Sequence, residues 1–171
     1  MTDQKEKIRY HRPGMVGEHH RGDAGQLILL ILFLAVWITD TFIWHYSTFL
    51  NRVVPLYIRI PAAVIVMVAG FYLAKVGMRI VFGIEREKPE LITNSVFRIV
   101  RHPIYLGAIL FYPGMMLLSI SLSAAVIWIF IIILYYFLSR FEEKLLIDTF
   151  GEAYREYKKQ VPMLFPRPRI Y

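Results

Sequence analysis

The stretch that decides the fold is IYLGAILFYPGMMLLSISLSAAVIWIFIIILYYFL, residues 104–138. It holds two apolar runs, 104–120 and 122–138, joined through the short sequence SISLS. Apolar runs of nearly this length cross the hydrocarbon core of a bilayer as helices. Because the connection leaves room only for a tight turn, the two runs predict an antiparallel helical hairpin. Pro113 and Gly114 lie inside the first run, where we expect a bend or local unwinding.

The composition of the whole chain is that of a membrane protein. Of its 171 residues, 57% are apolar, and the mean hydropathy is +0.48, whereas soluble domains are usually about 45–50% apolar. Two further apolar stretches, 27–46 and 55–83, complete four predicted spans of an all-α membrane bundle. We therefore divide the chain into a polar N-terminal arm, 1–26, and one membrane domain, 27–171. Cysteine is absent, which excludes thiolate nucleophiles and Cys-based metal sites.

The net charge of +7 comes mainly from segments outside the apolar runs. Lys and Arg concentrate in 1–26, 84–103 and 139–171, and the two other loops contain little besides Arg52. The positive-inside rule then predicts a multi-pass protein with both termini cytoplasmic. The same rule, together with attraction to anionic lipids, explains the basic loops more simply than nucleic acid does, so we expect no nucleic-acid partner.

Two polar features outside the main constellation leave alternatives open. Asp40 lies inside the first span, where a carboxylate is by default a functional candidate. We favour the alternative that it sits near the far interface or caps a helix break with its threonine neighbours. The arm contains His11, His19 and His20; without a further placed ligand we favour a flexible or surface-lying arm and expect no metal site.

The tail, residues 140–161, has the pattern of an amphipathic helix. Apolar side chains recur at spacings of three and four with charges opposite, at Leu146, Phe150, Tyr154, Tyr157 and Val161. Aromatic residues on one side and cations on the other predict a helix lying on the lipid headgroups. Gly151 marks a kink or a close approach within it, and Pro162 ends it.

Polar side chains converge where the hairpin returns to its starting side. Arg98, Arg101 and His102 stand before the third span, and Glu142 and Glu143 follow the fourth. Because a minimal turn joins the two spans, these groups are predicted to be neighbours at the membrane boundary. Each has a simpler explanation alone: anchoring arginines, a capping histidine, and glutamates on a solvated face. Gly107, one turn into the third span, leaves room for a bulky group or allows a close helix crossing.

The motif RHPIYLG, followed by EEKLLIDTFGEAYREYKKQVP, resembles the isoprenylcysteine carboxyl methyltransferase and phospholipid methyltransferase superfamily. The similarity covers roughly residues 70–168 and includes LITNSVFRIV upstream of the motif. Members are integral membrane enzymes that use S-adenosylmethionine without a Rossmann-like fold. In agreement, the chain has no Gly-rich dinucleotide loop.

The resemblance implies a cytoplasmic cofactor pocket closed by the tail helix. The residues that it implies for binding S-adenosylmethionine are Leu91, Ile92, Phe97, His102, Pro103, Ile104, Tyr105 and Glu142, and we add Gly107 for the space it leaves. On the acceptor side we assign Arg140, with Glu143 as the available proton acceptor. The chain departs from the family at two positions: Leu138 stands where an acceptor-side arginine is usual, and Ser95 replaces a glycine.

The predicted function is methyl transfer from S-adenosylmethionine to an amphipathic, lipid-borne acceptor. A prenylcysteine-type carboxylate is the acceptor we favour, and the amine of a phospholipid is the alternative. Two other classes stay open: a non-catalytic membrane scaffold, and a reductase related to membrane sterol reductases. Those reductases are longer chains with more spans. The predicted partners are the bilayer and the acceptor that it delivers.

Overall fold

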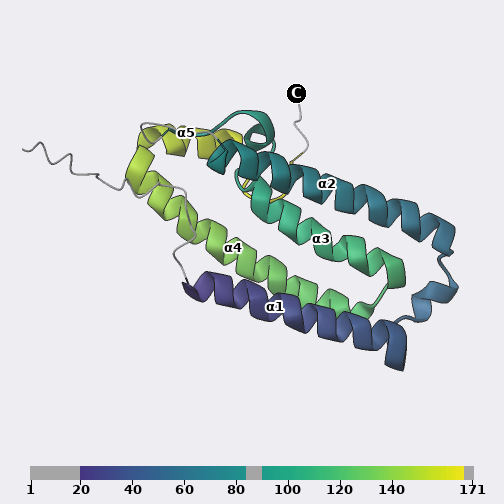
Figure 1. The fold of residues 1–171 in the computed structure, drawn as a ribbon. Coiled ribbons are helices and arrows are strands. Elements are labelled where there is room, and N and C mark those ends of the chain that lie inside the picture. The colour runs from purple at the N-terminus through teal and green to yellow at the C-terminus, as the bar shows by residue number, and fades with distance from the viewer. Residues whose placement is uncertain (1–19, 84–89, 168–171) are drawn as a thin grey trace, which may run out of the picture.

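The computed structural model describes residues 20–83 and 90–167, with side chains from residue 24 onward. All regular structure among them is helical (Figure 1). A short helix, α5, follows four longer ones, and the five are α1 (His20–Thr39), α2 (Leu56–Phe82), α3 (Pro103–Ser119), α4 (Leu122–Phe150) and α5 (Glu152–Gln160). Three short turns complete the order: the π-helical η2 (Asp40–Trp44) and the 3₁₀ turns η3 (Phe49–Arg52) and η4 (Ser95–Arg98).

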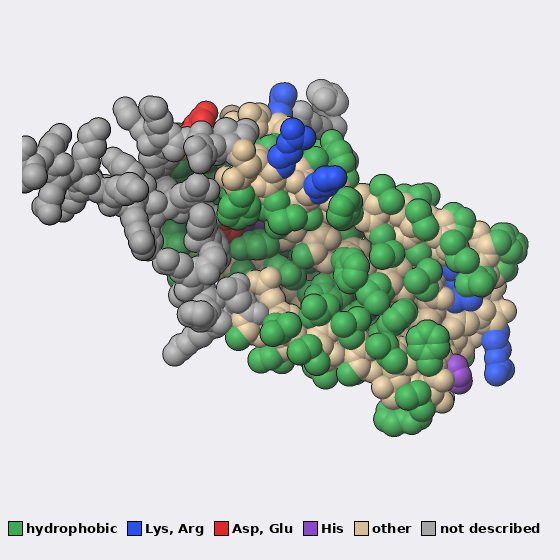
Figure 2. Space-filling view, in the orientation of Figure 1, with side chains coloured by type: hydrophobic (Ala, Val, Ile, Leu, Met, Phe, Trp, Pro, Cys, Tyr) green, Lys and Arg blue, Asp and Glu red, His purple; other side chains and the backbone are tan. Residues whose placement is uncertain are grey.

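The bundle has the dimensions of a membrane domain. Three segments are long and apolar enough to span a bilayer: Ala24–Trp44, Leu56–Phe82 and Leu122–Phe150. The predicted third span is α3, which has 17 residues and a length of about 25 Å at the usual helical rise. Hydrophobic side chains cover the flanks of the helices (Figure 2), as expected of surface that faces lipid. The prediction of an integral membrane, all-α bundle is confirmed.

The predicted hairpin is present. Between α3 and α4, Ile120 adopts a left-handed conformation with φ of 38°. Ser121 then caps α4, its hydroxyl accepting a hydrogen bond from the Ala124 amide at 3.2 Å. The turn returns α4 alongside α3 (Figure 1). The predicted unwinding at Pro113 is absent, since α3 is helical from Pro103 to Ser119.

The fourth helix is longer than the apolar run predicts. The predicted span ends at residue 138, but α4 continues to Phe150, so it carries the first half of the predicted tail helix. The helix ends at Gly151, which has φ of 57°, a conformation that glycine adopts without the Cβ penalty of other residues. The kink expected there is thus a change of helix, from α4 to α5 (Figure 1).

Small residues let α2 and α3 cross closely. A Cβ atom added at Gly107 would lie 2.5 Å from the Gly70 carbonyl oxygen and 2.9 Å from the Ala74 Cβ. At Gly70 it would lie 2.9 Å from the Gly107 carbonyl oxygen. Such mutual approach of backbones is typical of small residues at helix interfaces in membranes. The close helix crossing, which the sequence offered as the alternative, thus accounts for the glycine at position 107, and its assignment to cofactor binding stays a prediction.

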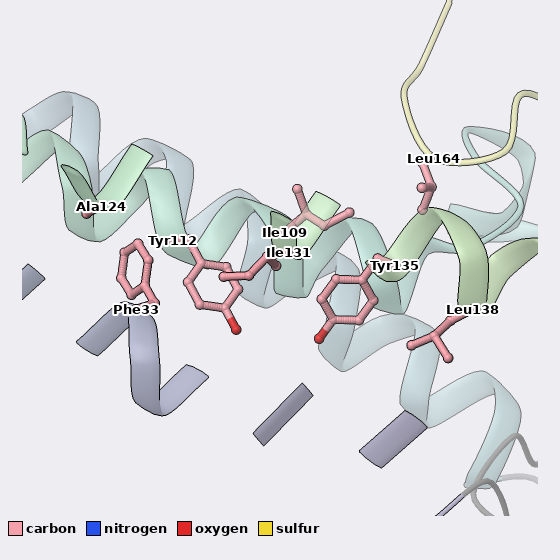
Figure 3. Packing of buried hydrophobic residues seen from close by; sticks show 8 residues of the cluster. All are labelled: Phe33, Ile109, Tyr112, Ala124, Ile131, Tyr135, Leu138 and Leu164. Atoms are coloured by element: carbon pink, nitrogen blue, oxygen red, sulfur yellow. The ribbon is translucent and has the colours of Figure 1, made fainter. Parts of the chain in front are cut away.

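The hydrophobic core lies between α1, α3 and α4 (Figure 3). The Phe33 ring meets the Tyr112 ring edge-on with centroids 4.8 Å apart, and Ile109 and Ile131 are buried beside them. The Trp128 indole donates a hydrogen bond to the Ile109 carbonyl at 3.0 Å. This packing fixes α3 against α4 and therefore fixes which residues meet where α3 begins.

Asp40 belongs to a polar cluster at the opposite end of the bundle. It is 4% exposed and lies where α1 gives way to the π-helical turn. Its carboxylate accepts hydrogen bonds from the Ser47 amide at 2.9 Å and from the hydroxyls of Ser47 and Ser121 at 2.5 Å. Asp40 does lie at a helix break, but its hydrogen-bond partners are Ser47 and Ser121 and not the neighbouring threonines, so it ties the end of α1 to the start of α4.

Candidate functional site

The site is built around His102, which occupies the N-cap position of α3. Its side chain makes no capping hydrogen bond. Instead, Nδ1 lies 3.2 Å from Glu142 Oε2 and Nε2 lies 3.7 Å from Glu143 Oε1, both on α4. The imidazole is 6% exposed and stacks on the Tyr105 ring, with centroids 5.6 Å apart and planes 6° apart. The predicted neighbours of the hairpin therefore do meet.

Glu143 is the centre of a buried network of charges. It is 1% exposed, so it is not part of a solvated helix face. Its Oε1 lies 2.6 Å from Arg101 Nη2, and its Oε2 lies 2.7 Å from Lys158 Nζ on α5. Arg101 Nη1 also donates to the carbonyls of Lys158 and Val161, at 2.7 and 2.8 Å. One carboxylate thus joins α4, α5 and the segment before α3.

The chain after α5 closes this end by pairing with the backbone of the motif. The amide of Arg101 donates to the Pro162 carbonyl at 2.9 Å, and that of His102 donates to the Met163 carbonyl at 3.1 Å. These bonds satisfy backbone groups that precede α3, where no helical partner is available. They also fix the two side chains relative to the tail.

The aromatic stripe of the tail faces protein, and the prediction that it lies on headgroups is wrong. Tyr154 is 0% exposed and Tyr157 is 8% exposed; with Val161 they pack against Leu91 and residues of α4. The Tyr157 hydroxyl donates to the Phe97 carbonyl at 2.6 Å. The stripe therefore closes the site instead of anchoring the chain in lipid.

Electrostatics at the site favour the charged form of the His102 imidazole. Burial lowers the pKa of His102, but hydrogen bonds and charge from Glu142 and Glu143 outweigh burial, and the pKa is raised. Burial also raises the pKa of Tyr154, with the Glu143 charge adding to it, so this hydroxyl remains a donor. The cluster thus holds two carboxylates among an imidazole, a guanidinium and an ammonium group.

Among the described residues at this end, two hydroxyls are buried with neither a hydrogen-bond partner nor an ion pair: Ser139 Oγ and Tyr154 Oη. The atoms His102 Nε2, Arg101 Nε and both Glu143 oxygens also lack a hydrogen bond of good geometry, but these groups face one another or Lys158 as ion pairs. Buried polar groups are nearly always satisfied in folded proteins, so groups left unsatisfied call for a reason. Ser139 is 0% exposed and lies on α4, three residues before Glu142. Unsatisfied polar groups buried near carboxylates are expected where a polar ligand binds.

The other predicted cofactor residues lie near this cluster along the chain, with Leu91 and Ile92 half-buried and Phe97 and Pro103 buried. Ile104 packs toward α2, where a Cβ on Gly77 would lie 2.8 Å from its Cγ1. Arg140 is exposed and has no ion pair with the His102 cluster. Among the described residues, no three His, Asp or Glu side chains are grouped as metal ligands.

Arg140 instead lines a basic groove of about 660 Å³ on the other side of Arg101. We call it the basic groove. Its cationic lining residues are Arg98, Arg101, Arg140, Lys158, Lys159 and Arg167.

Two residues of the network are absent from the sequence prediction. Lys158 follows Tyr154 by four residues and so shares its helix face, a spacing that could have identified it. Ser139 has no such signal, since a serine in a helix is equally common on any face. Neither the twin carbonyl contacts of Arg101 nor the pairing with 162–163 has a sequence pattern.

The fold and the site define a class of protein: a helical membrane protein with a buried cluster of an imidazole and paired carboxylates at one end. The phospholipid methyltransferase family matches residues 52–153, more than half of the chain, and the chain belongs to this family. The match contains the hairpin, His102 and both glutamates.

Curated relatives carry more specific names. A methanethiol S-methyltransferase 1 of Bradyrhizobium diazoefficiens is 40% identical over 86 residues, 49% of this chain and 29% of that protein. A methanethiol S-methyltransferase of Crocosphaera subtropica is 28% identical over 149 residues, 82% of this chain and 57% of that protein. A protein-S-isoprenylcysteine O-methyltransferase of Schizosaccharomyces pombe is 32% identical over 79 residues, 44% of this chain and 33% of that protein. The matched region thus spans less than two thirds of each of these relatives.

Proposed function

We propose that this protein transfers a methyl group from S-adenosylmethionine to a nucleophile at the membrane surface. The observation that carries the proposal is the burial of His102 between Glu142 and Glu143, at 3.2 and 3.7 Å, where α3 begins. Family membership adds the class of reaction. Together they favour an enzyme over a scaffold, since closely packed buried ionisable groups with shifted pKa values are typical of functional sites.

The residues present fit the proposed cofactor. S-adenosylmethionine is a zwitterion that carries a sulfonium cation, an ammonium group, a carboxylate and a flat adenine. The buried Tyr154 hydroxyl, which has no hydrogen-bond partner, supplies a donor to its anionic or hydroxyl groups. The Glu142 side chain, 16% exposed, supplies a carboxylate to its cations. The first turn of α3 adds a positive dipole end that favours a carboxylate.

We assign binding of the cofactor to the segment before α3, the start of α3 and one carboxylate of α4. Leu91, Ile92 and Phe97 would flank its adenosyl part, and the run from His102 to Tyr105 would line it. Glu142 would hold its cationic end. When bound, the cofactor supplies an electrophilic methyl group on sulfur.

The other residues position this site. Arg101 and Lys158 occupy both oxygens of Glu143, so we assign Glu143 the role of holding these cations and His102 in place. That role replaces proton acceptance as our hypothesis for Glu143. Methyl transfer is an in-line displacement in which orientation supplies much of the acceleration, and a rigid network suits that demand. Tyr154 and Tyr157 exclude water from the cluster by covering it.

For the acceptor we propose an anionic nucleophile, a thiolate or a carboxylate. A small thiol is named by the relatives from Bradyrhizobium and Crocosphaera, and a prenylated cysteine by the one from Schizosaccharomyces. The concentration of Arg and Lys at this end attracts anions and disfavours an ammonium headgroup. A prenylcysteine-type carboxylate remains our lipid-borne candidate, and a phospholipid amine is the alternative that the family description raises.

We further propose that this end of the bundle faces the cytoplasm, which places both chain termini there. Support comes from the excess of Lys and Arg at this end. The acceptor then approaches either from the cytoplasm, as a small thiol, or from the bilayer, as a lipid-borne carboxylate.

A labelled-methyl assay tests the proposal. Purified protein is incubated with radiolabelled S-adenosylmethionine and, separately, methanethiol, an S-farnesylated cysteine or phosphatidylethanolamine vesicles. We expect label in the thiol or the prenylcysteine ester, and loss of at least about tenfold in rate for His102→Ala and Glu142→Gln. Glu152→Gln, on the exposed face of α5, is the control and should retain the wild-type rate. No label in any acceptor, with no thermal stabilisation by S-adenosylhomocysteine, would favour the scaffold.

A further inference from the structure

The basic groove is a second candidate site, which borders the His102 cluster and shares Arg101 and Lys158 with the network around Glu143. It lies between the turn η4, α4 at Arg140, the end of α5 and the tail, and has a volume of about 660 Å³. Six of its lining residues are Lys or Arg, and none is Asp or Glu. A concave surface of one sign concentrates its field and attracts ions of the other sign. The groove is therefore built for an anion.

Half of these cations have no counter-charge in the described part of the chain. Arg101 and Lys158 pair with Glu143, and Lys159 pairs with Glu156 at 2.5 Å. Arg98, Arg140 and Arg167 are exposed, and among the described residues none of the three has an ion pair or hydrogen bond. Guanidinium groups bind phosphate through two parallel hydrogen bonds. Three unpaired arginines in one groove thus indicate a phosphate-bearing ligand.

The floor of the groove is rigid. Val161, Pro162 and Met163 line it, and the carbonyls of Pro162 and Met163 accept hydrogen bonds from the backbone that precedes α3. Arg101 crosses beneath to the Val161 carbonyl at 2.8 Å. A ligand therefore meets a formed surface and needs to order only the three arginine side chains, which lowers the cost of binding.

An apolar path leads from the groove along α4. Ile133, Phe137 and Arg140 are spaced by four and three residues, so they share one face of the helix. Ile133 is 45% exposed and Phe137 is 64% exposed, and both lie within a segment apolar enough to span the bilayer. Ile99, at the groove itself, is 48% exposed. A ligand with an anionic head and an apolar tail matches this surface along its whole length.

We propose that the basic groove binds the phosphate of an anionic glycerophospholipid, whose acyl chains lie along Ile133 and Phe137. Arg98, Arg140 and Arg167 contact the phosphate, and Ile99 contacts the glycerol end. This site does not depend on methyl transfer, because none of these residues belongs to the His102 cluster. Arg140 takes no part in the ion pairs of His102. Its side chain is therefore available to bind this phosphate.

Native mass spectrometry of the full chain in detergent tests the site. The protein is mixed with phosphatidylglycerol, with phosphatidylcholine of the same chains, or with inorganic phosphate alone. We expect retained phosphatidylglycerol, little phosphatidylcholine and no competition by inorganic phosphate at equal concentration. The double variant Arg98→Gln with Arg167→Gln should bind phosphatidylglycerol at least about tenfold more weakly, as should Arg140→Gln combined with either.

The matched control removes two cations outside the groove, Lys144→Gln with Arg155→Gln, and should bind as the wild type does. Equal loss in this control would show that total charge, not the groove, attracts the lipid and would overturn the proposal. Wild-type affinity in the Arg98 and Arg167 variant would overturn it as well. Equal retention of phosphatidylcholine, or full competition by inorganic phosphate, would exclude an anionic lipid as the ligand. A Phe137→Ser variant tests the acyl path, and unchanged lipid retention would contradict it.

Discussion

Replacing Glu143 by Gln tests whether its charge holds the inner end of the bundle together. The substitution keeps the volume of the side chain and removes the negative charge between Arg101 and Lys158. Arg101 would then be a buried cation, with its side chain 7% exposed and two carbonyls as its remaining acceptors. Lys158 is 34% exposed, so its ammonium group can turn toward water, and its share of the loss is small.

The loss of unfolding free energy depends on which cation stays buried without its partner. Removing one partner of a buried ion pair destabilises a protein by about 3–5 kcal/mol. Because one of the two cations reaches solvent, we expect the lower end, about 3 kcal/mol, or roughly a hundredfold in the unfolding equilibrium. Unfolding by SDS in mixed micelles, followed by circular dichroism, measures this change. Glu152→Gln is the control, because its pair with Arg155 is exposed and worth less than about 0.5 kcal/mol.

A double-mutant cycle separates the ion pair from general damage at the site. Arg101→Gln combined with Glu143→Gln should cost clearly less than the sum of the two single variants. Each single variant leaves one partner of the pair as a buried charge, whereas the double variant removes both. The reasoning is refuted if Glu143→Gln unfolds within about 0.5 kcal/mol of the wild type, or if the two single effects simply add.

Three further outcomes are expected. Gly107→Ala should lose about 1–3 kcal/mol in the same unfolding assay, because its Cβ meets the Gly70 carbonyl at 2.5 Å; stability equal to the wild type would mean that the helices cross less closely. Asp40→Asn should lower the melting temperature through a lost acceptor for Ser47 or Ser121, worth about 1–2 kcal/mol, yet leave the methyl-transfer rate unchanged; a lost rate in folded protein would assign Asp40 a direct role. Because the pKa of His102 is raised, its interactions stabilise the fold fully below about pH 6.5, and this contribution is lost as the pH rises through the raised pKa. Thermal stability should therefore fall on the alkaline side. His102→Ala should remove this dependence of the melting temperature on pH. A slope that survives in this variant would contradict the assignment.

Hydropathy and one short connection suffice to predict the hairpin and what it brings together. The turn at 119–123 leaves α4 no choice but to return beside α3, so His102 and Glu142 must end at similar depth. Their contact at 3.2 Å also requires the packing that sets the rotation of α3 against α4. The helix break at Asp40 is likewise readable, because a carboxylate within an apolar run needs nearby donors.

Other features depend on packing that a single sequence does not encode. The end of α4 at Phe150 is set by Gly151 and by contacts of the tail, whereas hydropathy changes much earlier, near Arg140. The stripe of tyrosines has the same periodicity whether it faces lipid or protein. Its burial against Leu91 depends on a segment more than fifty residues away. The crossing at Gly107 similarly needs the matching Gly70 of α2, which periodicity does not pair with it.

Binding of S-adenosylhomocysteine by isothermal titration calorimetry tests the proposed enzyme most directly. We predict saturable binding to the wild-type protein in detergent, weaker by at least about tenfold in Glu142→Gln and in His102→Ala, and unchanged in Lys144→Gln. Absence of binding to the folded wild type, or equal affinity in all four proteins, would contradict a cofactor site between α3 and α4.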